Sequence, residues 1–262
     1  MALQERNGAA ASPAAPDGSR MTLAEHIAEL RSRLIKALVA VAAGAVVGFL
    51  LYDRVLDFLI QPYCDVLPPE RACRLIITDP LEGFSVRLKV SGYVGLLLAS
   101  PVVFWQLWRF VTPGLHANEK RFAVPFVVSS VVLFCVGAGL AMWSFPRALD
   151  FLIAIGGEDL ETFYTPGKYL SLIVFMMLAF GAGFLVPVLL TFLQLAGIVT
   201  PRRLASLRRY AIVGIFVVGA VITPSGDPVT LCALAIPMVL LYEASILVGR
   251  MSARRRRAPA GT

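Results

Sequence analysis

Few residues of this sequence have a type and spacing that could carry out chemistry. It contains no His-Glu-x-x-His motif, no Gly-x-Ser-x-Gly motif, no P-loop and no cysteine pair at zinc-binding spacing. The two histidines, His26 and His116, are too few for a metal cluster. We therefore predict that the protein is not an enzyme and uses no metal or cofactor. The remaining candidates are isolated charged and polar residues between apolar segments.

The first candidate carboxylates lie in the segment Met21–Arg33. Apolar residues recur there at helical spacing: Leu23, Ile27, Leu30 and Leu34. This spacing predicts a short amphipathic helix that runs into the first apolar segment. Glu25 follows Thr22 at capping-box spacing, which explains it structurally. Glu29 can pair with Arg33 one turn later, worth about 0.3–0.5 kcal/mol on an exposed helix, and on this helix alone that is the simpler interpretation.

A third carboxylate, Glu119, lies in the polar segment Thr112–Arg121. Asn118 fits the N-cap of a following helix, which would place Glu119 in its first turn. The helix dipole favours a negative charge there by about 0.3–1 kcal/mol. This too is a sufficient structural explanation when the segment is considered alone.

Long apolar segments must position these residues. Of the 262 residues, 58% are hydrophobic and 16% charged, which excludes a cytosolic enzyme, a disordered chain and a nucleic-acid-binding module. Six runs are candidates to cross a membrane: Ala37–Tyr52, Val90–Trp108, Phe122–Pro146, Tyr169–Pro201, Tyr210–Gly226 and Pro228–Gly249. We predict an all-α integral membrane protein with six transmembrane helices, the first of them lengthened by Leu34 and Ile35 and by Val55–Ile60.

Basic residues predict the orientation, because basic loops are retained in the cytoplasm. With six spans, 17 of the 24 Lys and Arg residues fall on the side of the two termini. Both termini are therefore predicted to be cytoplasmic, with residues 1–20 a disordered tail, 21–250 the membrane domain and 251–262 a basic tail. Beyond the first tail, only three carboxylates stand on this basic face, and anionic lipid headgroups do not explain them. They are Glu25, Glu29 and Glu119.

An ordered series of short motifs resembles the TatC family, the multispanning receptor of the twin-arginine protein translocase. The series covers about Met21 to Arg250. It comprises Glu29-Leu-Arg-Ser-Arg33, Gln61-Pro62, Thr78-Asp79 with Phe84, Ser100-Pro101, Gln106-Leu-Trp-Arg-Phe110, Pro113-Gly-Leu115, Glu119-Lys-Arg121, Phe180-Gly181, Val186-Pro187, Thr223-Pro224 with Asp227, Ala235-Ile-Pro237 and Tyr242-Glu243. Single motifs are weak, but their common order is specific.

The resemblance implies a receptor that binds twin-arginine signal peptides of folded proteins at its cytoplasmic face. Glu29 and Glu119 would receive the two guanidinium groups, because a carboxylate accepts a guanidinium bidentately. Arg31, Gln106 and Phe110 would help to shape the pocket. This context reverses the preference for the simpler interpretation of Glu29 and Glu119.

The resemblance also implies the partners and the location. The partners are single-span proteins of the TatA/TatB type, further copies of the chain in a larger complex, and membrane lipid, with no nucleic acid. Transport would be driven by the proton-motive force across the bacterial cytoplasmic membrane. Further positions of interest in the motif series are Pro62, Phe84, Arg121, Asp227 and Glu243.

Several residues keep more than one interpretation. Glu243 either faces the protein interior with a function or is solvated near the inner interface. Asp227 follows a turn and is best explained as the cap of the last helix. Cys64 and Cys73 lie in the first outer loop, where they are either free or joined in a disulfide.

One position departs from the family pattern. Leu185 stands before Val186-Pro187, where many family members carry Glu, so the fourth span contributes no charge. The alternative function is a small-molecule or ion transporter. Such a transporter would need several converging charges within the membrane, and the sequence offers only Glu243.

Overall fold

The computed structural model describes residues 23–66, 73, 75–111, 123–156, 164–223 and 226–257. Within these ranges all regular secondary structure is helical, which confirms the predicted fold class at this level. The helices are α1 (Leu23–Leu50), α2 (Tyr52–Cys64), α3 (Glu82–Val111), α4 (Ala123–Gly156), α5 (Pro166–Leu195), α6 (Pro201–Ser206), α7 (Arg208–Ile222) and α8 (Pro228–Arg257).

Five of these helices are long and apolar enough to cross a membrane, namely α1, α3, α4, α5 and α8. Residues 210–222 of the remaining predicted span, Tyr210–Gly226, lie in the 15-residue helix α7. This is shorter than the roughly 20 residues that usually cross a bilayer. The amphipathic segment at the start of the described chain is continuous with the first span, since α1 begins at Leu23.

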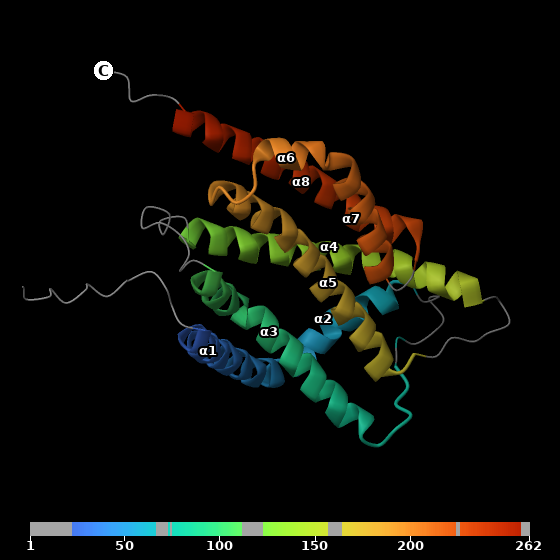
Figure 1. Ribbon diagram of the computed structural model, residues 1–262. Coiled ribbons are helices and arrows are strands. Elements are labelled where there is room, and N and C mark those ends of the chain that lie inside the picture. Colours follow the sequence, from blue (N-terminus) through green and yellow to red (C-terminus); the bar gives the residue numbers. More distant parts are fainter. Residues whose placement is uncertain are drawn as a thin grey trace, which may run out of the picture.

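The expectation that Val55–Ile60 lengthens the first span is wrong. α1 ends at Leu50, and α2 is a separate 13-residue helix that runs in a different direction (Figure 1). Its charged residues Asp53, Arg54 and Asp57 are exposed. Its buried residues are Leu59, Pro62 and Tyr63. α2 is therefore amphipathic, and its charged face disfavours continuation through hydrocarbon.

The helices pack in sequence from one side of the molecule to the other. α1 lies against α3, α4 and α5 cross in the middle, and α6, α7 and α8 form the far side (Figure 1). α5 and α8 are parallel, because Gly183 faces Met238 and the Gln194 side chain donates to the Ser245 carbonyl at 3.0 Å. We call the end that holds α2 and the starts of α3, α5 and α8 the α2 end. The opposite end, where α1 begins, is the Glu29 end.

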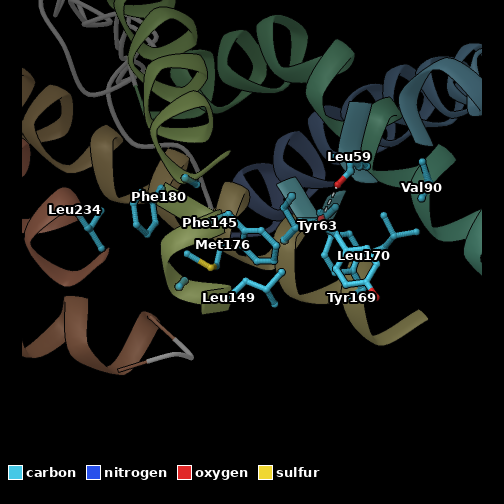
Figure 2. Close-up of a cluster of buried hydrophobic side chains, with 14 of the residues drawn as sticks. Leu59, Tyr63, Val90, Phe145, Leu149, Tyr169, Leu170, Met176, Phe180 and Leu234 are labelled. Atoms are coloured by element: carbon cyan, nitrogen blue, oxygen red, sulfur yellow. Dashed lines mark hydrogen bonds between the residues drawn. The ribbon is translucent and has the colours of Figure 1, made fainter. Parts of the chain in front are cut away.

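Buried aromatic residues hold the α2 end together (Figure 2). The Tyr169 hydroxyl on α5 donates to the Leu59 carbonyl on α2 at 2.9 Å. The Tyr169 ring also contacts the rings of Tyr63 and Phe145. Nearby, burial raises the pKa of the Tyr164 phenol above its usual value.

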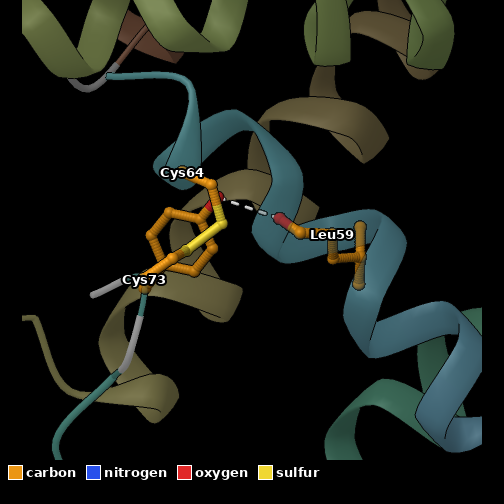
Figure 3. Close-up of a disulfide and its surroundings, with 4 residues drawn as sticks. Leu59, Cys64 and Cys73 are labelled. Atoms are coloured by element: carbon orange, nitrogen blue, oxygen red, sulfur yellow. Dashed lines mark hydrogen bonds between the residues drawn. A yellow bond between two sulfur atoms is a disulfide. The ribbon is translucent and has the colours of Figure 1, made fainter. Parts of the chain in front are cut away.

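A disulfide joins Cys64, the last residue of α2, to Cys73, with 5.3 Å between their Cα atoms (Figure 3). Figure 3 also shows the Leu59 carbonyl, one turn and more before Cys64 on α2, which accepts the tyrosine hydrogen bond. The chain that leaves α2 is thus tied back to it. Of the two states that the sequence left open for these cysteines, the structure shows the disulfide, which an outer loop permits.

Glycines allow α1 and α3 to touch through their backbones. A Cβ atom at Gly95 would lie 2.5 Å from the Ala45 nitrogen, and one at Gly44 would lie 2.8 Å from the Gly95 oxygen. A Cβ atom at Gly48 would lie 2.9 Å from the Ser91 oxygen. The two helices are therefore antiparallel in a fixed register, with Gly44 opposite Gly95 and Gly48 opposite Ser91. Small residues of this kind allow close packing between membrane helices.

We expect Gly95→Ala to destabilise the protein, because the added methyl group meets backbone atoms that cannot move independently. A forced overlap of this kind costs about 1–3 kcal/mol, or about 3–10 °C in Tm. Thermal unfolding of the purified protein in detergent measures it.

Gly92→Ala on the same helix is the matched control, because nothing lies within 4 Å of a Cβ atom there. Its Tm should be unchanged or higher, since Ala is the better helix former by about 1 kcal/mol. Equal melting temperatures for the two variants would contradict the backbone contact.

Candidate functional site

Glu29 and Arg33 form an ion pair on the first turns of α1. The Arg33 Nε donates to the Glu29 Oε1 at 3.1 Å, and the Arg33 Nη2 contacts the same oxygen. The second carboxylate oxygen, Oε2, is buried without a hydrogen-bond partner among the described residues, as is the Arg33 Nη1. Glu29 therefore retains one uncommitted acceptor in a partly buried position.

Gln106 and Phe110 lie four residues apart on α3 and so share one face of that helix. The glycine register of α1 and α3, continued towards the Glu29 end, brings Gln106 level with Arg33 and Phe110 level with Glu29. Both side chains are partly buried. The α1–α3 contact thus brings three of the predicted site residues to one end of the molecule.

Arg31 belongs to a different surface of α1. It is exposed and lines a shallow groove of about 590 Å³ with Ile27, Ile35 and Lys36. Residues two positions apart on a helix do not face each other, so Arg31 and Glu29 diverge. Glu119 and Arg121 fall between α3 and α4, outside the described residues, and so does Thr22 before α1.

Pro62, Phe84 and Asp227 lie at the α2 end, remote from Glu29. Pro62 is buried inside α2, whereas Phe84 is 67% exposed on the first turn of α3. The buried Asp227 caps α8, because its Oδ2 accepts the Thr230 backbone N–H at 2.6 Å. This placement agrees with the capping interpretation of Asp227.

Glu243 pairs with Arg208, the first residue of α7. The Arg208 Nη2 lies 2.8 Å from the Glu243 Oε2, and the Arg208 Nε lies 2.6 Å from the Glu243 Oε1. Both side chains are more than a third exposed. Glu243 is thus a partly exposed residue in a bidentate ion pair that joins α7 to α8, rather than an isolated carboxylate in the protein interior.

Leu185 lines an apolar cavity of about 260 Å³ between α3, α4 and α5. Trp108 stacks on Phe126 there, with 4.7 Å between ring centroids, and meets Phe192 edge-on at 4.3 Å. The Trp108 Nε1 is buried without a partner among the described residues. The departure from the family pattern at Leu185 therefore leaves this cavity without a carboxylate.

Sequence reasoning missed Glu82, the first residue of α3, which bonds to the start of α5 and to the segment before α3. Its Oε1 accepts the Gly167 backbone N–H at 3.0 Å, and its Oε2 accepts the Thr78 backbone N–H at 3.1 Å. The starts of α3 and α5 are thereby held together. An acidic residue in the first turn of a helix was the available signal, but it does not reveal a partner 85 residues away.

Comparisons with known proteins agree with this arrangement. Residues 25–237 match the family model described as "Sec-independent protein translocase protein (TatC)". The chain belongs to the TatC family. This confirms the resemblance inferred from the ordered motifs and accounts for most of the chain.

Individual TatC proteins are similar over most of their length. The protein named Sec-independent protein translocase protein TatC from Aquifex aeolicus is 38% identical, over 90% of this chain and 98% of that protein. Its namesake from Frankia casuarinae is 42% identical, over 91% of this chain and 68% of that protein. A crystal structure of the "Twin Arginine Translocase Receptor- TatC" superposes with a TM-score of 0.70 and 39% identity, covering 88% of this chain and 100% of the other.

Proposed function

We propose that this protein is the receptor subunit of a twin-arginine translocase and binds the paired arginines of signal peptides on folded proteins at the Glu29 end. Family membership supports the translocase role. The observation that carries the binding role is the uncommitted Oε2 of Glu29, a buried acceptor at the end of the molecule with the basic face.

An arriving guanidinium satisfies this oxygen in a way that an ammonium cannot. The guanidinium is planar and presents a fork of N–H donors that matches the two oxygens of a carboxylate. Arg33 already holds Glu29 in place through Oε1. The signal arginine would therefore add to the existing pair at Oε2 or replace Arg33 at both oxygens.

Glu119 is proposed as the acceptor for the second arginine, because it is the other carboxylate of the basic face in the family motif. Gln106 and Phe110 would line the α3 side of the pocket, level with Arg33 and Glu29. Arg31 faces a separate groove and is left out of the pocket, while Arg121 remains a candidate through the motif alone.

The proposed topology has six spans with both termini in the cytoplasm of a bacterium. α7 is the shortest span, and the Glu29 end is then the cytoplasmic end. The complete translocase would also contain partners of the TatA/TatB type and further copies of the chain, and the proton-motive force would drive it. This subunit would carry no catalytic group. A small-molecule or ion transporter is less well supported, because Glu243 is partly exposed and paired with Arg208.

We expect Glu29→Ala and Glu119→Ala each to weaken crosslinking of a twin-arginine signal peptide about tenfold or more, because each removes a charge-assisted pair worth about 1.5–3 kcal/mol. The measurement is site-specific crosslinking in membranes at matched protein levels.

Asp57→Ala, at an exposed carboxylate on α2, is the matched control and should crosslink as the unaltered protein does. Full crosslinking by a double variant of Glu29 and Glu119 would contradict the binding role. Loss of crosslinking in the Asp57 variant as well would show that the effect is not specific to the site.

The short α7 predicts a locally thin membrane. Its 15 residues reach about 22 Å, against about 30 Å of hydrocarbon in a typical bilayer. Spin labels at the exposed Tyr210 and Val221 should therefore both report headgroup depth. Labels at the same 11-residue spacing along α4, at the exposed Val132 and Trp143, provide the reference. A Val221 label at the depth of the bilayer centre would contradict both the thinning and the assignment of α7 as a span.

A further inference from the structure

A groove of about 1000 Å³ separates the first halves of α3 and α5 at the α2 end, remote from the proposed signal site. One wall is a stripe along α3 formed by Glu82, Ser85, Lys89 and Tyr93. The other is a stripe along α5 formed by Lys168, Ser171, Leu172 and Phe175. Both stripes follow helical spacing, so each is one continuous face of its helix.

The polarity of the groove changes with depth. Its rim is mostly polar, with Thr78, Asp79 and the first turns of both helices, and also holds the exposed Leu81. The part farther from the helix starts, here called the floor, is apolar. It reaches Phe175, which is 52% exposed and lies nine residues into α5, or about 14 Å from the helix start. Lys89 lies between, about 10 Å into α3, from where its long side chain can extend towards the rim.

The acidic residues of the rim accept hydrogen bonds from the backbone. Both oxygens of Glu82 accept backbone N–H groups, and the Asp79 Oδ1 accepts the Leu81 N–H at 2.7 Å. Lys89 and Lys168 are exposed, and in the described part of the chain neither ammonium has a hydrogen-bond or ion-pair partner. Glu82 and Asp79 keep their negative charges, but backbone hydrogen bonds hold them in place, whereas the two ammonium groups are free to bind an anion.

We propose that this groove is a binding site for an anionic phospholipid. The phosphate and headgroup lie between Lys89 and Lys168, and an acyl chain lies along Tyr93, Leu172 and Phe175. At the membrane boundary, the lysines match the anionic headgroup of such a lipid, and the apolar cleft deeper in the membrane matches its acyl chain. In the orientation proposed above, the lipid comes from the outer leaflet.

An acidic peptide shares the charge of this ligand but not its apolar part. Along its floor the groove offers a peptide backbone only the Tyr93 hydroxyl and the Ser171 hydroxyl, and the latter already donates to the Gly167 carbonyl at 2.6 Å. The acyl chain is therefore the better match for the floor.

Native mass spectrometry of the full-length protein in detergent tests the proposal, with phosphatidylglycerol or phosphatidylcholine added at equal concentration. We expect phosphatidylglycerol to be retained selectively. In the variant with Lys89→Gln and Lys168→Gln, retention of phosphatidylglycerol should fall about tenfold or more, because two lysine contacts are lost. Leu172→Trp, which fills the floor and keeps both charges, should also lower retention.

The matched control carries Arg54→Gln and Arg147→Gln, which remove two exposed basic residues at the α2 end outside the groove. It should retain phosphatidylglycerol normally. Equal retention of the two lipids, unchanged retention in the lysine variant, or an equal loss in the control would overturn the proposal. Competition by glycerol phosphate or an acidic peptide as effective as that by the lipid would also overturn it, since the acyl chain would then contribute nothing. No signal peptide is present, so the result is independent of the receptor role.

Discussion

The proposed receptor site depends on one contact, the backbone approach of α1 to α3 at Gly44 and Gly95. Only 6% of the most apolar stretch of α1 is buried, against 44% for α5, so α1 has little other packing to hold it. In a membrane, apolar side chains gain little by leaving lipid for protein, and close van der Waals contact decides which helices associate. The glycines provide that contact. They also fix the register that brings Glu29 level with the end of α3.

Different contacts hold the two ends of the molecule together. At the α2 end, the Tyr169 hydroxyl joins the start of α5 to α2, and the Cys64–Cys73 disulfide ties the following chain to the end of α2. The Glu82 carboxylate accepts backbone N–H groups from Gly167 and Thr78. At the Glu29 end, the Glu29–Arg33 pair leaves one oxygen and one nitrogen buried without partners among the described residues. Buried polar groups without partners are costly, so such a pair is poised for a ligand that supplies the missing hydrogen bonds.

The sequence allowed the helical class and the family to be predicted, because these depend on local composition and motif order. It misplaced Val55–Ile60, since an apolar run is consistent both with a continued span and with the buried face of a separate amphipathic helix. The bridges from Glu82 to Gly167 and from Gln194 to Ser245 join residues far apart in the chain, and no local pattern encodes such partners. The ion pair of Arg208 with Glu243 is of the same kind, whereas Glu29 with Arg33 follows from helical spacing alone.

The central claim, that carboxylates at the Glu29 end recognise paired guanidinium groups by charge and shape, is tested most directly by exchanging the charges. The affinity of the purified protein is measured for a signal peptide with its arginine pair and for the same peptide with a glutamate pair. The account predicts that the unaltered protein binds only the arginine peptide, and that a variant with Glu29→Arg and Glu119→Arg prefers the glutamate peptide. A variant that still binds the arginine peptide with unaltered affinity would contradict it.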